Sequence, residues 1–146
     1  MPDAGNRRVM AFDFGTRRIG VATGQELLGT GEPLAMIPAR DGIPDWSVVE
    51  KLLEQWRPDL VLVGLPLNMD DTENEMCARA RKFGNRIHGR FHYPVEMVDE
   101  RLTSFEAKGD VMARGGSRDF GRHGVDDRAA VLILETWFRE QDNSAG

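Results

Sequence analysis

The sequence predicts an α/β fold with a mixed sheet of five strands and helices on both faces. Three observations support this prediction. Short strand-like runs open the chain, a segment with helix-spaced apolar residues follows, and strand-like and helix-like segments then alternate to the end. The opening strands have short connections and should be antiparallel, whereas strands separated by helices should be parallel.

The first three strands are expected over residues 8–14, 19–23 and 33–37. Residues 15–18 are short enough to join the first two strands as a hairpin, so these strands should pair antiparallel. The glycine-containing residues 29–31 form a turn before the third strand. The fold is therefore predicted to open as a three-stranded meander.

The pattern then changes to a helical period. Apolar residues at steps of three and four from Trp46 to Trp56 predict a helix, with Ser47 and Glu50 as a capping box. The continuous apolar run over residues 60–63 is typical of a buried parallel strand.

The second half alternates further. A second helix is predicted over residues 72–88 with Gly89 as its stop, and residues 95–99 should form the next strand. A third helix is expected over residues 103–114, a glycine-rich loop over 115–124, and a last helix from about Asp126 to Glu140.

The size and composition indicate one globular domain over residues 1–146, with frayed termini at about 1–7 and 141–146. The chain is 40% hydrophobic and 29% charged. No apolar run approaches the roughly 20 residues that span a bilayer, and no secretory signal is visible, so cytoplasmic residence and no membrane contact are expected. Cys77 is the only cysteine, which excludes an internal disulfide and a cysteine zinc cluster.

The net charge of -5 argues against binding nucleic acid by bulk positive charge alone. It does not exclude a nuclease, because bound divalent metals reverse the sign of a carboxylate site.

Three acidic positions are candidates for chemistry. Asp13 ends the first strand, on the face of Val9 and Ala11, where an ionised carboxylate is costly to bury without a metal, partner or catalytic role. The alternative is that Asp13 caps the following turn. Gly15 leaves space for a ligand or for backbone to approach closely.

The other two acids follow the later elements. Glu100 stands just past a parallel strand, at the strand end where open sheets bind ligands. Only one of Asp99 and Glu100 should face as Asp13 does, and alternation does not say which. Asp126 opens the last helix, where it could also be a simple cap.

Together, two acids at strand ends and one at a helix start can converge on one metal site. Hard oxygen ligands select Mg²⁺ or Mn²⁺. Two such ions, typically ~3.5–4 Å apart, support in-line attack of water on a phosphodiester.

Four ordered motifs resemble the YqgF family, whose members are also called RuvX-like or Holliday junction resolvase-like proteins and pre-16S rRNA nucleases. The motifs are Asp13-Phe14-Gly15-Thr16 through Gly20-Val21-Ala22, Val63-Gly64-Leu65-Pro66-Leu67-Asn68, Asp99-Glu100-Arg101-Leu102-Thr103, and Val125-Asp126 before Ala129-Ala130. The resemblance extends from about Arg8 to Phe138.

The resemblance implies a ribonuclease H-like fold and a nuclease that matures the 5′ end of 16S ribosomal RNA during ribosome biogenesis. It also implies that Asp13, Glu100 and Asp126 are the catalytic and metal-binding acids. Fold analogy alone does not fix the substrate.

Substrate contacts are assigned to residues near these acids, namely Gly15, Arg18, Asn68, Arg101, Arg118 and Arg122. Arg114 lies just before, and His123 within, the glycine-rich loop that holds the last two, and His123 is more simply a surface residue than a proton shuttle. Arg79, Lys82 and Arg86 form a stripe that is either a phosphate track or, by the simpler interpretation, a solvated helix face. Trp46, Trp56 and Trp137 are interpreted as core residues.

Three alternatives remain. A Holliday junction resolvase-type DNA endonuclease would use the same triad but needs a dimer for paired cuts, whereas an RNA-trimming enzyme works as a monomer or weak homodimer. A non-catalytic RNA-binding assembly factor would retain only the fold. A nucleotide-binding, kinase-like module would need a second domain.

Overall fold

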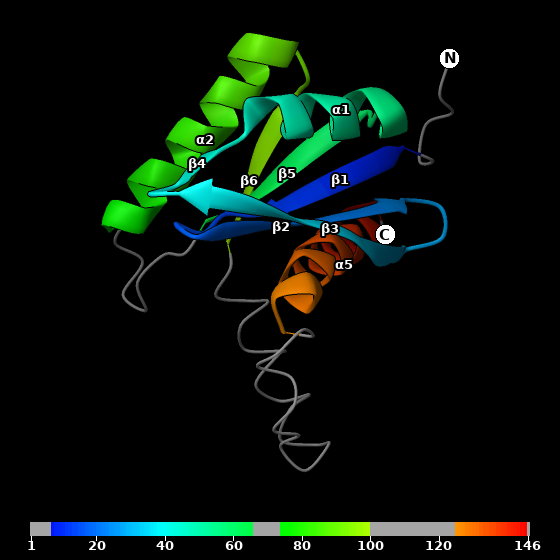
Figure 1. The fold of residues 1–146 in the computed structure, drawn as a ribbon. Coiled ribbons are helices and arrows are strands. Elements are labelled where there is room, and N and C mark those ends of the chain that lie inside the picture. The colour runs from blue at the N-terminus through cyan, green and yellow to red at the C-terminus, as the bar shows by residue number, and fades with distance from the viewer. Residues whose placement is uncertain (1–6, 66–73, 100–124, 146) are drawn as a thin grey trace.

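The computed structural model describes residues 7–65, 74–99 and 125–145, and in the last of these segments it describes side chains only over residues 129–141. A mixed sheet runs in the order β4-β3-β2-β1-β5-β6, with helices on both of its faces (Figure 1). The strands are β1 (Arg8–Asp13), β2 (Arg18–Gln25), β3 (Thr30–Arg40), β4 (Ile43–Pro44), β5 (Leu60–Leu65) and β6 (Val95–Asp99), and the helices are α1 (Trp46–Trp56), α2 (Glu75–Phe91) and α5 (Val125–Ala145).

The predicted α/β class and strand directions are confirmed. β2 pairs antiparallel with β1 and β3, whereas β5 pairs parallel with β1 and β6. The sheet has six strands rather than the predicted five. The additional strand, β4, pairs antiparallel with the end of β3 and has only two residues, too few to show an alternating pattern.

Strand β3 is also longer than the predicted residues 33–37. Its pairing with β2 runs from Gln25 opposite Thr30 to Arg18 opposite Pro38, with a shift in register between Val21 and Ala22. Backbone pairing therefore extends the strand past Pro33 and Pro38, which sequence propensity disfavours.

Four predicted helix boundaries differ from the structure. Helix α2 begins at Glu75 rather than at residue 72, and α5 continues past Glu140 to Ala145. Helix α1 is capped by Asp45, whose side chain accepts a hydrogen bond from the Ser47 backbone N–H at 3.0 Å, so Ser47 is not the capping residue. Helix α2 continues through Gly89 to Phe91 and ends at His92 in the left-handed conformation. A single glycine costs a helix only about 1 kcal/mol, and here the helix continues past it. The predicted helix over residues 103–114 lies outside the described residues.

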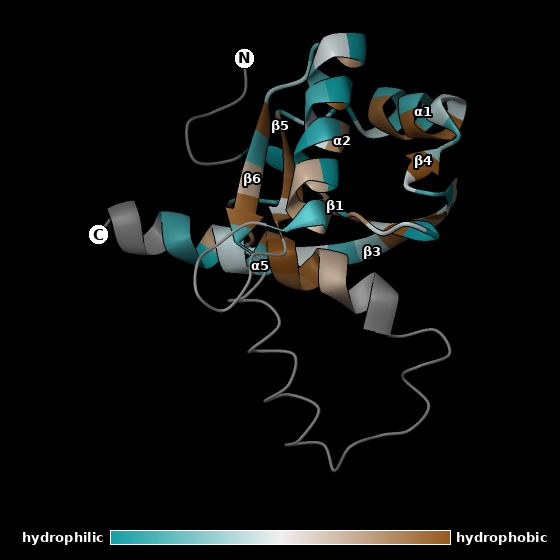
Figure 2. Cartoon of the chain, turned by 90° about the vertical axis from the view of Figure 1, so that its left-hand side faces the viewer, coloured by the Kyte–Doolittle hydropathy of each residue, from teal (hydrophilic) through white to brown (hydrophobic). Residues whose placement is uncertain are grey.

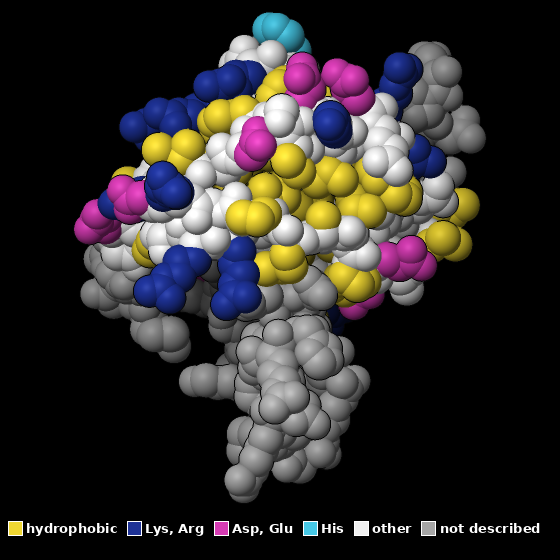
Figure 3. Space-filling view, viewed as in Figure 1, with side chains coloured by type: hydrophobic (Ala, Val, Ile, Leu, Met, Phe, Trp, Pro, Cys, Tyr) yellow, Lys and Arg dark blue, Asp and Glu magenta, His cyan; other side chains and the backbone are white. Residues whose placement is uncertain are grey.

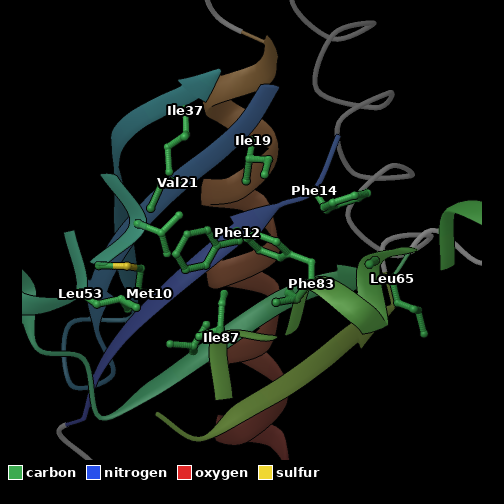
Figure 4. Close-up of a cluster of buried hydrophobic side chains, with 14 of the residues drawn as sticks. Met10, Phe12, Phe14, Ile19, Val21, Ile37, Leu53, Leu65, Phe83 and Ile87 are labelled. Carbon is green, nitrogen blue, oxygen red and sulfur yellow. The ribbon is translucent and has the colours of Figure 1, made fainter. Parts of the chain in front are cut away.

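The face of the sheet covered by α1 and α2 contains an aromatic core. Phe12 packs edge-on against Phe83 with ring centroids 5.5 Å apart, and Phe14 lies at the same distance from Phe83 (Figure 4). Met10, Ile19 and Ile87 are fully buried in the same cluster. This core fixes both helices to the strands that lead to the candidate site.

The opposite face is covered by α5. Ala130, Ile133 and Leu134 are fully buried against Val9 and Ala11 of β1. Figure 2 shows hydrophobic stretches of α5 where the helix crosses beneath the sheet. In the described segments, no helix is both long and apolar enough to cross a membrane.

Candidate active site at the carboxyl end of the central strand

Asp13 is the last residue of β1, between the two halves of the sheet. Met10, Phe12 and Phe14 belong to the aromatic core, whereas Val9 and Ala11 belong to the cluster beneath α5. Since side chains alternate along a strand, Asp13 belongs to the α5 face, as predicted from the sequence. Its side chain is half-buried, which places a carboxylate at the boundary between core and solvent.

The parallel strands β5 and β6 end at the same edge of the sheet as β1. Val63 is the partner of Phe12, and Leu65 is the partner of Asp99. The last residues of β5 and β6, Leu65 and Asp99, therefore lie at the same edge of the sheet as Asp13, where open α/β sheets bind ligands. The candidates Asn68, Glu100, Arg101, Arg118 and Arg122 follow these strands in the sequence and lie outside the described residues, as do Arg114 and His123.

The facing of Asp99 follows from its neighbours in β6. Val95 and Met97 pack against the aromatic core, whereas Val98 is buried beneath α5. The Trp137 indole N–H of α5 donates a hydrogen bond to Glu96 at 2.8 Å. Asp99 alternates with Val98 and thus belongs to the face opposite that of Asp13.

Asp126 is the second residue of α5, the helix that covers the face of Asp13. Its side chain is not among those described. The small side chains of its paired alanines let this helix pack closely, and Ala130 is fully buried while Ala129 is half-buried. Gly31 also permits close approach, because a Cβ there would lie 2.6 Å from the Leu134 side chain.

A tight turn follows Asp13. A Cβ at Gly15 would lie 2.5 Å from the Arg18 carbonyl oxygen, so the close approach that Gly15 permits is made by backbone. The Thr16 carbonyl accepts a hydrogen bond from the Gly42 N–H at 2.9 Å, and the Arg17 carbonyl accepts one from the Ala39 N–H at 2.8 Å. Arg18 begins β2 as an exposed residue. Substrate contacts by Gly15 and Arg18 stay predictions.

The aromatic face carries a pocket that the sequence did not predict. It has a volume of about 240 Å³ and is lined by Phe14, Asp41, Gly42, Ile43, Trp46, Arg79, Lys82, Phe83 and Arg86. It brings together the basic stripe of α2, the turn between β3 and β4, and the residue after Asp13. The only signal in the sequence was the helical spacing of Arg79, Lys82 and Arg86. The wall opposite these cations comes from the turn at Asp41, about 40 residues away in the chain, which local spacing does not reveal.

Arg79 is already paired in this pocket. Its guanidinium lies 2.9 Å from an Asp41 carboxylate oxygen and 3.3 Å from a Glu75 carboxylate oxygen. The hydrogen bond and the charge of Asp41 raise the pKa of Arg79 further. Lys82 and Arg86 form no ion pair with any residue in the described ranges, so they supply the pocket's available positive charge.

The interpretation of the tryptophans as core residues is confirmed. Trp137 of α5 is buried between that helix and the sheet, and Trp46 and Trp56 pack against the aromatic core. Trp46 stacks on Phe83 at 5.7 Å and has the Arg90 guanidinium 4.7 Å from its ring centroid. It also lines the pocket, so it is core on one side only.

The described side chains contain no cluster of three or more His, Cys, Asp or Glu residues suited to a metal ion. This observation does not test the predicted triad, because Asp13 is its only member with a described side chain. The triad and its metals therefore stay predictions.

Comparison with known proteins gives a consistent result. Residues 7–140 match the family model described as "RuvX: Holliday junction resolvase". A Marinobacter nauticus protein named "Putative pre-16S rRNA nuclease" is 83% identical over 141 residues, which are 97% of this chain and 99% of that protein. A Pectobacterium atrosepticum protein of the same name is 57% identical over 136 residues, covering 93% of this chain and 98% of that protein.

Solved structures of resolvases share the fold. Thermus thermophilus RuvC in complex with Holliday junction substrate superposes with a TM-score of 0.59 at 18% identity, covering 92% of this chain and 95% of that chain. The yeast mitochondrial Holliday junction resolvase Ydc2 gives a TM-score of 0.54 at 13% identity, with coverages of 92% and 78%. At these identities the likeness shows the ribonuclease H-like fold alone.

Proposed function

The chain belongs to the RuvX family, and from this membership we propose that it is a metal-dependent nuclease that matures the 5′ end of precursor 16S ribosomal RNA. That the protein is a nuclease that hydrolyses ester bonds follows from the family match over residues 7–140 and from the 83% identical relative. The proposal that its substrate is ribosomal RNA comes from the names of the relatives.

The observation that carries the proposal is the position of Asp13. Its half-buried carboxylate ends the central strand, on the face that α5 covers and at the edge where β5 and β6 also end. A carboxylate held in this position is suited to a metal or to an acid-base role. The facing of Asp99 adds support, because it leaves Glu100 as the acid of that pair in the proposed site.

The proposed ligands fit a divalent cation chemically. Asp13, Glu100 and Asp126 would supply only carboxylate oxygens, which suit Mg²⁺ or Mn²⁺ better than zinc. When bound, such ions lower the pKa of a water and stabilise the leaving oxygen.

The residues of the chain provide positioning. Asp13 is fixed by strand pairing to Gly20 on one side, and the following turn is tied to residues 39–42 by two backbone hydrogen bonds. The carboxylate therefore needs little reorganisation when the substrate binds. We also propose that the protein is cytoplasmic and acts as a monomer or weak homodimer.

The test compares Asp13→Asn with Asp99→Asn, a matched change at the end of β6, two strands away and on the opposite face. A 5′-extended 16S precursor RNA is incubated with each purified protein in Mg²⁺, Mn²⁺ or chelator. We expect the wild type and Asp99→Asn to process the RNA in metal only, and Asp13→Asn to lose more than about 100-fold in rate, since ligands matter at least as much as the groups that support them. Equal rates for the two variants would contradict the assignment of Asp13.

A second candidate is cleavage of four-way DNA junctions. It is favoured by the description of the family and by the fold shared with RuvC. The same preparations are therefore given a synthetic four-way junction, and their oligomeric state is measured in solution. Junction cleavage by a dimer, with the RNA left intact, would replace the ribosomal proposal. Binding of RNA without cleavage of either substrate would favour an assembly factor.

A further inference from the structure

Helix α2 is a basic element in an acidic chain. It carries Arg79, Arg81, Lys82, Arg86 and Arg90 against the single acid Glu75, a net charge of +4, whereas the whole chain has a formal net charge of -5. Figure 3 shows Lys and Arg side chains gathered over α2 at the upper left of the molecule. Such a concentration of positive charge on one face is the electrostatic footprint of a nucleic-acid contact.

The pocket beside α2 gives this charge a defined place. Arg79, Lys82 and Arg86 lie at steps of three and four residues, so they share one side of the helix. The rings of Phe14, Trp46 and Phe83 line the same pocket, and Ile43 adds an apolar residue that is 54% exposed. A solvated helix face would not need such a pocket, and this observation favours a phosphate contact over the simpler interpretation of the stripe.

The charge balance inside the pocket favours an anion. Its lining contains three cations and one carboxylate, Asp41, which is already bonded to Arg79. Lys82 and Arg86 are left without an ion pair in the described part of the chain. Two unneutralised cations above an apolar floor suit one phosphodiester group with an attached sugar or base.

The pocket also lies at the carboxyl end of β1, where Asp13 is located. Phe14, which lines it, directly follows Asp13, and the two side chains belong to opposite faces of the sheet. A Cβ at Gly42 would lie 2.9 Å from the Phe14 ring, so Gly42 lets the pocket wall close against the end of β1. The pocket and the carboxylate are therefore joined through two consecutive residues of the chain.

We propose that this pocket binds a backbone phosphate of the RNA substrate, away from the cleaved bond, through Lys82 and Arg86. The inference rests on the proposed function for the identity of the RNA. It adds a substrate-binding surface on the face of the sheet opposite to the acidic site. Lys82 and Arg86 are binding residues in this proposal, not catalytic ones.

The experiment measures RNA binding apart from cleavage. Asp13→Asn protein is titrated into a fluorescein-labelled single-stranded RNA copied from the 16S precursor, and anisotropy gives Kd at several salt concentrations. Lys82→Glu and Arg86→Glu are introduced separately. Lys51→Glu, an identical change of charge at an exposed lysine of α1, is the matched control.

We expect Lys82→Glu and Arg86→Glu each to weaken binding by about fivefold or more at 0.1 M salt, and to reduce the slope of log K against log salt by about 0.7, as for one lost phosphate contact on a single strand. Lys51→Glu should stay within about twofold of the parent. Thermal melts check the fold, and Lys82→Gln, which removes the charge without reversing it, should give an intermediate Kd.

The outcomes separate the two proposals. If binding depends on Lys82 but the wild-type protein cleaves no RNA, the pocket proposal is supported and the nuclease assignment is contradicted. Cleavage that depends on Asp13, with Lys82→Glu and Arg86→Glu binding RNA as Lys51→Glu does, would overturn the pocket and leave the nuclease assignment intact. The basic helix would then be better explained by an acidic protein partner.

Discussion

The two faces of the sheet are built differently although they share the same strands. One face is covered by two helices over a core of aromatic rings, including Phe12, Phe14 and Phe83. The other is covered by α5, which packs on small residues such as Ala11 and Ala22. The central strand β1 contributes to both faces, and Asp13 extends the α5 face.

The difference indicates a division of roles. The aromatic face combines large buried area with a cationic pocket at its edge, so it should carry much of the stability and part of the proposed binding. The α5 face uses close helix-sheet contact and ends at a carboxylate, so it should be more sensitive to changes in backbone spacing. Substitutions on each face can test this contrast.

The largest effect is expected at the centre of the aromatic face. Phe12→Ala removes a fully buried ring that packs on Phe83, and should lower the free energy of unfolding by about 3–5 kcal/mol. Urea denaturation followed by circular dichroism measures this change. A loss below about 1 kcal/mol would mean that the aromatic face is not the main source of stability.

An intermediate effect is expected where α5 meets the sheet. A Cβ at Gly24 would overlap the Thr30 carbonyl oxygen and come within 3.1 Å of Leu134. Gly24→Ala should therefore cost about 1–3 kcal/mol, because backbone on one side cannot yield easily. The three atoms nearest to a Cβ at Gly31 all belong to the Leu134 side chain, so Gly31→Ala should cost less. If urea denaturation showed a larger loss for Gly31→Ala than for Gly24→Ala, backbone contacts would not be what limits the spacing between α5 and the sheet.

A small gain is expected at the far end of α2. Gly89 lies within the helix, is exposed and has nothing within 4 Å of the Cβ position. Gly89→Ala should raise the free energy of unfolding by about 0.5–1 kcal/mol through helix propensity alone. Differential scanning calorimetry should show a higher Tm with unchanged RNA affinity. A lower Tm would show that this end of α2 is not simply solvated.

The smallest effect concerns pH on the α5 side. The Arg7 guanidinium donates hydrogen bonds to both Glu26 carboxylate oxygens and lies 5.0 Å from the Trp137 ring centroid. The hydrogen bond from Arg7 lowers the pKa of Glu26 below its ordinary value of 4.5. The stabilisation is therefore complete above about this pH and is lost as the pH falls through the lowered pKa.

Because Arg7 is 39% exposed, the pair should contribute less than about 1 kcal/mol. Glu26→Gln should thus be slightly less stable than the wild type at pH 7, and the difference should shrink at pH 3. A difference that grows on acidification would contradict the assigned direction of the pKa shift.

The sequence predicted the elements whose hydrophobic period is clear. The alternation in β1 assigned Asp13 to the face of Val9 and Ala11, and the structure confirms it. Strand β4 was missed because two residues carry no period, and its formation depends on pairing with β3. The start of α1 was misplaced because Asp45 and Ser47 both suit a cap, and only the backbone geometry distinguishes them.

The candidate site could be predicted only in part. Local pattern and family resemblance made Asp13 a candidate, but no local pattern could reveal the pocket, whose walls meet through the packing of Trp46 on Phe83 and the turn at Gly42. Lys82 and Arg86 were visible as a stripe, but only the tertiary structure shows the aromatic floor beside them. Long-range packing therefore supplies what residue spacing cannot.

The alternation along β1 also sets which changes of chain length the protein can accept. A single residue inserted between Val9 and Phe12 would turn the side chains on one side of the insertion to the opposite face of the sheet. Either an aromatic ring or the carboxylate would then have the wrong surroundings. The exposed hairpin tip at Leu27, Leu28 and Gly29 has no such constraint. Length variation, peptide tags and fused domains therefore belong at that tip, whereas β1 must keep its residue count.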